Sequence, residues 1–367
     1  MAPEHVTATP GELDPNHYLL ERYVDRASRR RLLKPYYAVK PMLPRRLQLA
    51  VRRLYASRQS RREFPRWPNE DLLVRHYQEL FRREIARAGG RPVPFVNFWP
   101  ERRRFAFVLT HDVESAAGIE NIPRVREREA RHGLVSSWNF VAEDYPIADG
   151  VFDDLRSAGC EVGLHGIHHD GKLFQDEESF EQMLPRIHRY LHEWDVAGFR
   201  SPATHRDAAW MPRLGSLYDS SFPDTDPFEP HAGGCCSIFP YFIGDLVELP
   251  ITLVQDHTMW DILRQPGIDL WLEKTEWIRR HHGLVNVIVH PDYVLADERL
   301  DLYERFLSAL ANYDDGWHAL PRDVAGWWKA RASMHVDPNG DAVLGSNGWT
   351  ATVAHARLDG ERIVYDV

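Results

Sequence analysis

Seven short runs in the middle of the chain have apolar residues in a row or in alternation with polar ones, and longer amphipathic stretches separate most of them. The runs are residues 105–110, 136–141, 161–166, 197–202, 218–222, 247–253 and 284–290. Runs of this length are typical of β-strands. Most are followed by a stretch that repeats apolar positions at the helical period, namely 119–132, 149–158, 176–193, 267–282 and 298–312. Strands and helices that alternate in this way form parallel sheets, and about seven such units favour an α/β barrel that is closed or nearly closed.

The two ends of the chain have different patterns. Before the first strand, residues 43–58 and 71–88 repeat apolar positions at helical spacing, which predicts a mostly helical N-terminal extension over residues 1–103. After residue 330, the turn sequences PNGD, SNGW and DGE separate short alternating runs, which predicts a small antiparallel β appendage over residues 331–367. The barrel itself is expected over residues 104–330.

Charge divides the chain into a basic front and an acidic body. The net charge is −9, but residues 21–62 hold fourteen basic residues against two acidic ones, so the remaining residues carry about −21. The pattern of residues 43–58 predicts an amphipathic basic helix. Its arginines are Arg45, Arg46, Arg52 and Arg53. Two interpretations are open: the helix docks on the acidic body by its apolar stripe, or it makes peripheral contact with an anionic membrane surface. An acidic body argues against nucleic acid as a partner.

Composition favours a globular protein of the cytoplasm. Hydrophobic residues make up 43% of the chain, which fits a packed core and excludes a disordered chain. We find no run of about eighteen apolar residues and no signal-peptide pattern. The three cysteines, Cys160, Cys235 and Cys236, cannot form a disulfide framework. We therefore expect a cytoplasmic location, with peripheral contact at the inner membrane face as the second interpretation of the basic helix.

Ionisable residues follow most of the predicted strands at their carboxyl ends. In chain order they are His111, Asp112, Glu114, His165, Arg200, the acids of residues 219–226 and His290, with the segment from Pro250 onward at the same rim. In parallel α/β folds the carboxyl ends of the strands meet at one face, where the loops form the active site. This many acids, histidines and arginines at one face predicts an active site there.

Two histidines in the stretch EVGLHGIHHDG have the spacing of a metal site. His165 and His169 are four residues apart, and they share a face if the chain turns helically after Gly166. His168 then points partly away. Two imidazoles and one carboxylate leave positions open for water and substrate, as in hydrolytic metal sites. The spacing alone is equally compatible with surface or capping histidines.

The alternation of a strand places Asp112 and Glu114 on one side. Residues two apart on an extended chain project in the same direction, so His111 faces the other way and is expected to have a structural role. Two neighbouring carboxylates repel unless positive charge lies beside them. A metal beside Glu114 and Arg200 beside Asp112 would supply it. Arg200 as an ordinary buried ion pair, and His290 as a strand cap, are the alternatives.

The motifs THDVE, HGIHH, FRSP and IVHPD, in this order, resemble those of the polysaccharide deacetylase family (NodB homology, carbohydrate esterase 4). The likeness covers about residues 105–320 and implies a distorted (β/α)7 barrel. It also implies one role for each matching residue: Asp112 as catalytic base, Arg200 as its partner, His290 as general acid, and Glu114, His165 and His169 as metal ligands. A divalent metal ion is implied, with Zn²⁺ as the expected one.

The chain departs from the family pattern at three places. Glu114 replaces the usual aspartate and lengthens the arm by one methylene. Ala203 stands where an aromatic residue is common, although its backbone amide remains available to an oxyanion. No tryptophan-containing fourth motif is found. The stretch SSFPDTDPFEP offers Asp224 to orient His290, with Asp226 as the other candidate.

The resemblance implies a metal-dependent de-N-acetylase, a C–N hydrolase that acts on an N-acetylated amino sugar. The substrate is then a glycan, a glycan precursor or a lipid-linked glycan. Two alternatives stay open. One is hydrolysis of a small or cyclic amide, since some relatives in the superfamily resemble allantoinases. The other is a catalytically inactive barrel that binds glycan.

Overall fold

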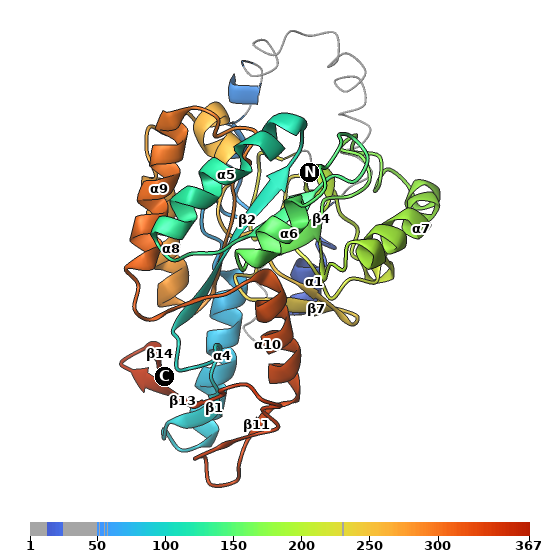
Figure 1. Cartoon of the computed structure of the whole chain (residues 1–367). Coiled ribbons are helices and arrows are strands. Elements are labelled where there is room, and N and C mark those ends of the chain that lie inside the picture. Colours follow the sequence, from blue (N-terminus) through green and yellow to red (C-terminus); the bar gives the residue numbers. More distant parts are fainter. Residues whose placement is uncertain (1–12, 25–49, 51, 55, 57, 230) are drawn as a thin grey trace.

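A curled sheet of mostly parallel strands forms the centre of the molecule (Figure 1). The structure, a computed structural model, describes residues 13–24, 50, 52–54, 56, 58–229 and 231–367. The parallel strands follow the seven predicted runs: β2 (Phe105–Val113), β3 (Ser137–Phe140), β4 (Glu161–Leu164), β5 (Gly198–Phe199), β6 (Tyr218–Asp219), β8 (Leu246–Glu248) and β9 (Leu284–Ile288). Two further strands lie at the edges, β7 (Tyr241–Ile243), antiparallel to β8, and β10 (Gly316–His318), parallel to β2.

The curl of the sheet is nearly closed between β8 and β9. The backbone amides of Thr252 and Leu253, just beyond β8, donate to the carbonyl oxygen of Asn286 in β9 at 3.2 and 3.1 Å. The side-chain amide of Asn286 also donates to the carbonyl oxygens of Leu249 and Pro250. The predicted distorted (β/α) barrel is therefore confirmed.

Helices follow the strands and cover the outside of the sheet (Figure 1). They are α5 (Ala116–Arg131), α6 (Val151–Ser157), α7 (Glu177–Glu193), α8 (Asp269–Arg280) and α9 (Asp297–Ala311). All nine residues of β2 are buried, because β9 pairs with one edge while β3 and β10 share the other. A strand buried in this way reads as a continuous apolar run rather than an alternating one. Its last residues are polar because they reach the rim.

A strand that precedes the barrel pairs with the C-terminal strands in a second, three-stranded sheet. β1 (Val93–Val96) pairs with β13 (Val353–Asp359), which pairs with β14 (Arg362–Asp366), all antiparallel. Helix α4 (Leu72–Arg87) lies against this sheet, and Phe81 contacts the rings of Phe95 and Tyr365 at 5.0 and 5.3 Å between centroids. The antiparallel appendage is confirmed. The domain boundaries at residues 103 and 330 stay predictions.

The remaining described elements are short or lie outside the barrel. They are α1 (Pro15–Leu19), α10 (Pro321–Ser333), β11 (His335–Val336), β12 (Val343–Leu344) and the helical turns Pro202–Thr204, Met211–Leu214 and Thr258–Ile262. Among the described residues, no helix has both the length and the apolar character needed to cross a membrane.

The basic segment contacts the barrel where the structure describes it. Arg45 and Arg46 lie outside the described residues. Arg53 donates to the carbonyl oxygen of Asp261 at 2.8 Å, and a guanidinium nitrogen of Arg52 lies 3.3 Å from Nε2 of His257. This part of the segment is therefore docked on the barrel, but not as the first interpretation expects: its arginines make contacts with the barrel, while Leu54 of the apolar stripe is 77% exposed.

Candidate functional site

The polar strand ends converge at the rim of the barrel. Glu114 directly follows β2, His165 follows β4 and Arg200 follows β5, while His290 lies two residues after β9. Short strands that end in tight loops place these side chains at one face, as the parallel topology requires. The structure brings six of the seven predicted site residues together there, and Asp224 is the exception.

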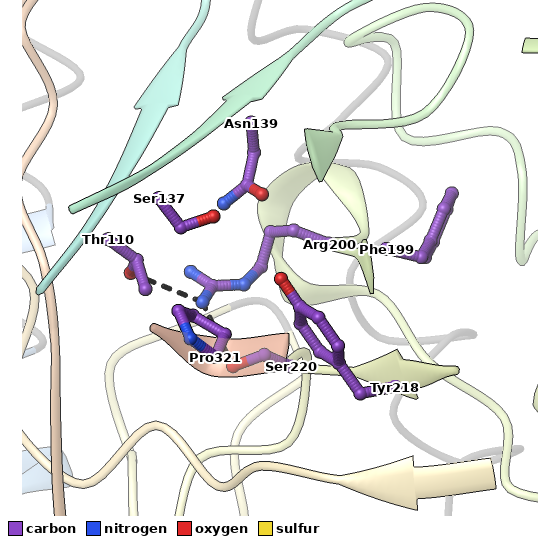
Figure 2. A pocket seen from close by; sticks show the side chains of 8 residues that line it. All are labelled: Thr110, Ser137, Asn139, Phe199, Arg200, Tyr218, Ser220 and Pro321. Carbon is purple, nitrogen blue, oxygen red and sulfur yellow. Dashed lines mark hydrogen bonds between the residues drawn. The ribbon is translucent and has the colours of Figure 1, made fainter. Parts of the chain in front are cut away.

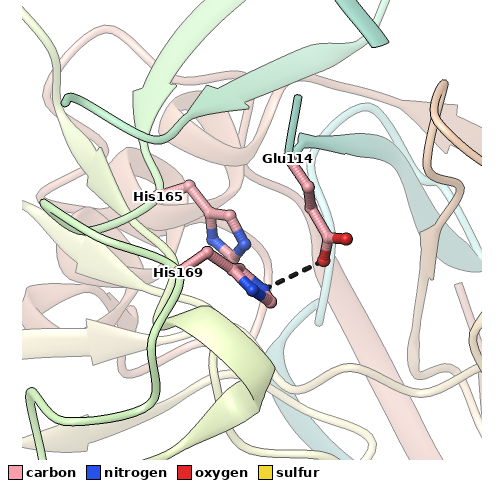
Figure 3. Close-up of side chains that lie close together, drawn as sticks. All are labelled: Glu114, His165 and His169. Carbon is pink, nitrogen blue, oxygen red and sulfur yellow. Dashed lines mark ion pairs between the residues drawn. The ribbon is translucent and has the colours of Figure 1, made fainter. Parts of the chain in front are cut away.

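Glu114, His165 and His169 form a group that fits a metal ion (Figure 3). Their ligand atoms all lie within 4.8 Å of one another, and Nε2 of His169 is 3.0 Å from Oε1 of Glu114. Nδ1 of His165 donates to the carbonyl oxygen of Arg200 at 3.0 Å, which leaves Nε2 as the unprotonated nitrogen. That nitrogen is buried and has no hydrogen-bond partner. A buried lone pair beside a second imidazole and a carboxylate fits a divalent cation.

The pKa values of His165 and Glu114 also fit a metal site. Burial lowers the pKa of His165 to about 4, so the imidazole is neutral and able to bind a metal. Burial acts in the opposite direction on Glu114, but the hydrogen bond from His169 and the charges of the nearby histidines outweigh it and lower its pKa. Glu114 is therefore an anion. Burial lowers the pKa of His169, but the hydrogen bond to Glu114 and the charge of that carboxylate outweigh it and raise the pKa, so a cation bound here has to displace a proton from that imidazole.

The loop that carries the two histidines differs from the expectation. Residues 165–171 form irregular turns rather than a helix, and Gly166 turns the chain with a φ of 73°. The two rings still meet, with centroids 5.4 Å apart. His168 points to Asp144, with Nδ1 2.7 Å from Oδ1. A left-handed glycine turn thus performs the task that a helical turn was expected to perform.

Asp112 lies beside the metal group and is held by two partners. Nη1 of Arg200 lies 3.4 Å from Oδ2, and the Asn139 amide donates to Oδ1 at 2.9 Å. Nε2 of His165 is 4.0 Å from Oδ2. Burial raises the pKa of Asp112, but the charges of Arg200 and the histidines, with the Asn139 hydrogen bond, outweigh it and lower the pKa. The carboxylate is therefore ionised and fixed.

Arg200 occupies a narrow polar cavity inside the barrel (Figure 2). Its Nη2 donates to Ser220 at 2.9 Å and to Thr110 at 3.3 Å. The cavity is lined by Thr110, Ser137, Asn139, Phe199, Arg200, Tyr218, Ser220 and Pro321. The hydroxyl groups of Thr110 in β2 and of Ser220, directly after β6, thus orient the guanidinium toward Asp112. Arg200 and Asp112 form a buried ion pair, which also makes Arg200 a partner of the candidate base.

His290 is oriented by Asp256, not by Asp224. Nδ1 of His290 donates to Oδ1 of Asp256 at 2.7 Å, and its backbone amide donates to Oδ2 at 2.9 Å. Burial lowers the pKa of His290, but the Asp256 carboxylate outweighs it and raises the pKa to about 10. Nε2 faces the metal group and lies 3.6 Å from Oε1 of Glu114.

Asp224 is buried elsewhere, and its expected position was wrong. Its carboxylate accepts from Nζ of Lys274 at 2.7 and 2.9 Å. Asp226 accepts from the backbone amide of Phe228 at 2.7 Å. The missed residue, Asp256, follows the apolar run at 247–253. Asp256 could have been found in the same way as the other site residues, because it is a carboxylate just after a predicted strand.

Two neighbouring features support the rim. His111 faces away from the site, as expected: Nδ1 donates to the carbonyl oxygen of Val289 at 2.8 Å, and Nε2 lies 2.7 Å from Glu129. Ala203 and Thr204 both have a φ of 52°. Such left-handed conformations are costly outside glycine and are typical of functional loops. The loop that carries the Ala203 amide is therefore held in an unfavourable shape by its surroundings.

The chain resembles known proteins in sequence and in fold. No protein-family model matches the chain. A peptidoglycan deacetylase of Helicobacter pylori is 20% identical over 237 residues, covering 54% of this chain and 80% of the relative. A solved structure from Mycobacterium smegmatis, described as a polysaccharide deacetylase, is 21% identical with a TM-score of 0.51 and covers 66% of this chain and 96% of its own. A solved allantoinase is 16% identical, with a TM-score of 0.48 and coverage of 63% and 92%. The resemblance to the polysaccharide deacetylase family and its barrel fold is confirmed.

Proposed function

Because the chain is related to the polysaccharide deacetylases, we propose that it is a metal-dependent de-N-acetylase acting on an N-acetylated amino sugar. One observation carries the proposal: a held carboxylate, a metal-binding group and an oriented histidine share one rim. Glu114 lies 3.0 Å from His169 and 3.6 Å from His290, while His165 lies 4.0 Å from Asp112. These are the separations needed for groups that act on one small acetamide.

The metal ligands are Glu114, His165 and His169, and Zn²⁺ is the proposed ion because it favours mixed nitrogen and oxygen ligands with an open position. When bound, the ion supplies Lewis acidity, which polarises a carbonyl oxygen and makes a water molecule easier to deprotonate. The protein's own contribution is to fix the three ligands and to exclude protons from His165.

The remaining residues move protons and hold charge. Asp112, kept ionised by Arg200, accepts the proton of the water that attacks the acetamide carbonyl carbon. His290 donates a proton from Nε2 to the amide nitrogen as the C–N bond breaks. Its Nδ1 is held by Asp256, so the donating nitrogen faces the site. The products are acetate and a free amino sugar, and the backbone amide of Ala203 is the proposed donor to the oxyanion.

The substrate class rests on the relative's name and on the site. We propose a glycan, a glycan precursor or a lipid-linked glycan, because the curated relative is named a peptidoglycan deacetylase. Ala203 favours a second candidate, a small or cyclic amide, because the side chain there offers no aromatic face for a sugar ring to stack on.

A substrate panel separates the two candidates. Zinc-loaded protein is incubated with N-acetylated amino sugars and, separately, with cyclic ureides, and acetate release and ring opening are measured. We expect acetate release from the sugars alone. Ring opening without acetate release would favour the amide hydrolase, and bound zinc without turnover of either class would favour the inactive glycan-binding barrel.

Location and membrane contact stay proposals. Arg52 and Arg53 are docked on the barrel, so contact of the basic segment with an anionic membrane now depends on Arg45 and Arg46. Sedimentation with phosphatidylserine vesicles tests this. Charge reversal at Arg45 and Arg46 should reduce binding, and equal binding by both proteins would leave only the docked helix and a cytoplasmic protein without membrane contact.

A further inference from the structure

We infer that Tyr293 is a positioning residue that fixes Glu114 as a one-oxygen metal ligand. The inference rests on the proposed metal site and adds a residue that the sequence motifs do not assign to it. Tyr293 lies three residues after His290, in the loop between β9 and α9. Its hydroxyl donates to Oε2 of Glu114 at 2.7 Å.

The two oxygens of Glu114 have different neighbours. Oε1 faces the histidines, 3.0 Å from Nε2 of His169 and 3.6 Å from Nε2 of His290. Oε2 faces away from them and accepts from Tyr293. A hydrogen bond to one oxygen prevents the carboxylate from rotating both oxygens toward a cation. One coordination position thus stays open for water or substrate, as a hydrolytic site requires.

The need for such a partner follows from the length of the side chain. A glutamate has one more rotatable bond than the aspartate common at this position in the family, so it loses more conformational freedom when it is fixed. The backbone of Glu114 is already held, because its amide donates to Oδ2 of Asp292 at 2.9 Å. Asp292 fits there because residue 118 is glycine: a Cβ at Gly118 would lie 2.3 Å from Oδ2 of Asp292. Tyr293 fixes the other end of the arm.

The Tyr293 ring is itself held between two imidazoles. Its centroid lies 5.0 Å from that of His290 and 5.0 Å from that of His257. His257 is held in turn, with Nδ1 3.1 Å from Asp261 and Nε2 3.3 Å from Arg52 of the docked basic segment. The hydroxyl therefore approaches Glu114 from a fixed direction, and phenylalanine at this position would keep the ring and remove the hydroxyl with its hydrogen bond to Glu114.

Zinc affinity tests the inference without any substrate. Zn²⁺ is titrated against a competing chelator for the wild type, Tyr293→Phe and the control Tyr313→Phe. Tyr313 also donates to a glutamate, Glu276, at 2.6 Å, but this pair is not part of the metal group. We expect Tyr293→Phe to weaken zinc binding by about 10- to 100-fold, as loss of partners of metal ligands does. Tyr313→Phe should bind zinc as the wild type does.

A double-mutant cycle distinguishes the proposed hydrogen bond from a purely structural role of Tyr293. Glu114→Asp withdraws the carboxylate by about 1.5 Å, one C–C bond, and should break the hydrogen bond by itself. Tyr293→Phe should then have no further effect on zinc affinity in the Glu114→Asp background. Wild-type zinc affinity in Tyr293→Phe, or equal losses in both backgrounds, would overturn the inference. Absence of zinc binding in the wild type would instead overturn the proposed function.

Discussion

Asp112 and Glu114 are two residues apart, but different neighbours surround the two carboxylates and favour a different role for each. Asp112 is 3% exposed and bound by Arg200 and Asn139, so it has no freedom to turn toward a cation. Glu114 lies on a longer arm, and its carboxylate reaches His169. The same strand end thus supplies both the proposed base and a proposed metal ligand.

Substitutions at these two positions should fail differently. Asp112→Asn should keep bound zinc and lose at least about 100-fold in turnover, because only the proton acceptor is removed. Glu114→Ala should lose zinc first, and excess Zn²⁺ should restore part of its activity. Zinc content by elemental analysis and acetate release measure both effects. An empty site in Asp112→Asn, together with normal zinc and rate in Glu114→Ala, would mean that the roles are exchanged.

Asp256 should control the alkaline limb of the pH–rate profile. His290 acts as an acid only while protonated, so activity is present below its pKa and is lost as the pH rises through that pKa. Asp256 raises the pKa of His290 to about 10. Replacing it by asparagine removes the negative charge and lowers the pKa, so the limb of Asp256→Asn should move to lower pH. An unchanged limb would show that His290 is not the general acid.

Residues of the site differ in how far sequence reasoning could find them. Asp112, Arg200 and His290 lie at the ends of strands that the sequence pattern predicts. Asp256 and Tyr293 have no distinctive spacing, and their roles depend on which loop side chains turn toward the rim. Asp224 was misassigned because Lys274, fifty residues away, attracts it into the interior. Such pairings depend on tertiary packing and not on local pattern.

At the scale of elements, the N-terminal segment is tied to the loop that carries Ala203. Arg206 is buried and donates to both carboxylate oxygens of Glu21, which follows α1. The same guanidinium donates to the carbonyl oxygen of Thr204 at 2.8 Å. Thr204 is one of the two left-handed residues of the loop. The ion pair therefore supports an unfavourable backbone at the rim.

Removal of Glu21 should destabilise the fold strongly. Glu21→Ala leaves Arg206 buried without its carboxylate, and breaking a buried pair in this way costs about 3–5 kcal/mol. Replacing both residues by methionine should recover only part of the loss, because it removes the unpaired charge but also the hydrogen bond from Arg206 to Thr204. Urea denaturation measures the free energy of unfolding. The control is Arg22→Ala, whose exposed contact with Asp14 spans 3.9 Å and should contribute at most about 1 kcal/mol. Equal stability of Glu21→Ala and the wild type would contradict this account.

The elements themselves were largely predictable, and their pairing was not. Every predicted barrel strand and helix is present, because apolar periodicity reports burial directly. The pairing of β1 with β13 joins residues about 260 positions apart, and no local pattern encodes it. β5 and β6 have two residues each and were predicted as longer strands, because the chain stays buried after both ladders end, at Arg200 and Ser201 and at Ser220 and Ser221.

At the scale of the whole molecule, Arg52 and Arg53 of the basic segment contact the barrel, and β1, which precedes the barrel in the chain, shares a sheet with the C-terminal strands β13 and β14. Part of the basic charge of this segment therefore serves to dock it on the barrel. Arg52 also reaches His257, which packs on Tyr293, and Tyr293 donates a hydrogen bond to the proposed metal ligand Glu114. Regions outside the family likeness are thus in contact with the site.

The most direct test of the central claim is the metal dependence of acetate release from an N-acetylglucosamine oligosaccharide. Acetate and free amine are both quantified for zinc-loaded and metal-stripped protein. The account predicts equal amounts of acetate and free amine from the loaded protein, loss of both after stripping, and recovery on addition of Zn²⁺. Folded, zinc-loaded protein that releases no acetate from any N-acetylated amino sugar, or acetate release that is unaffected by stripping, would contradict it.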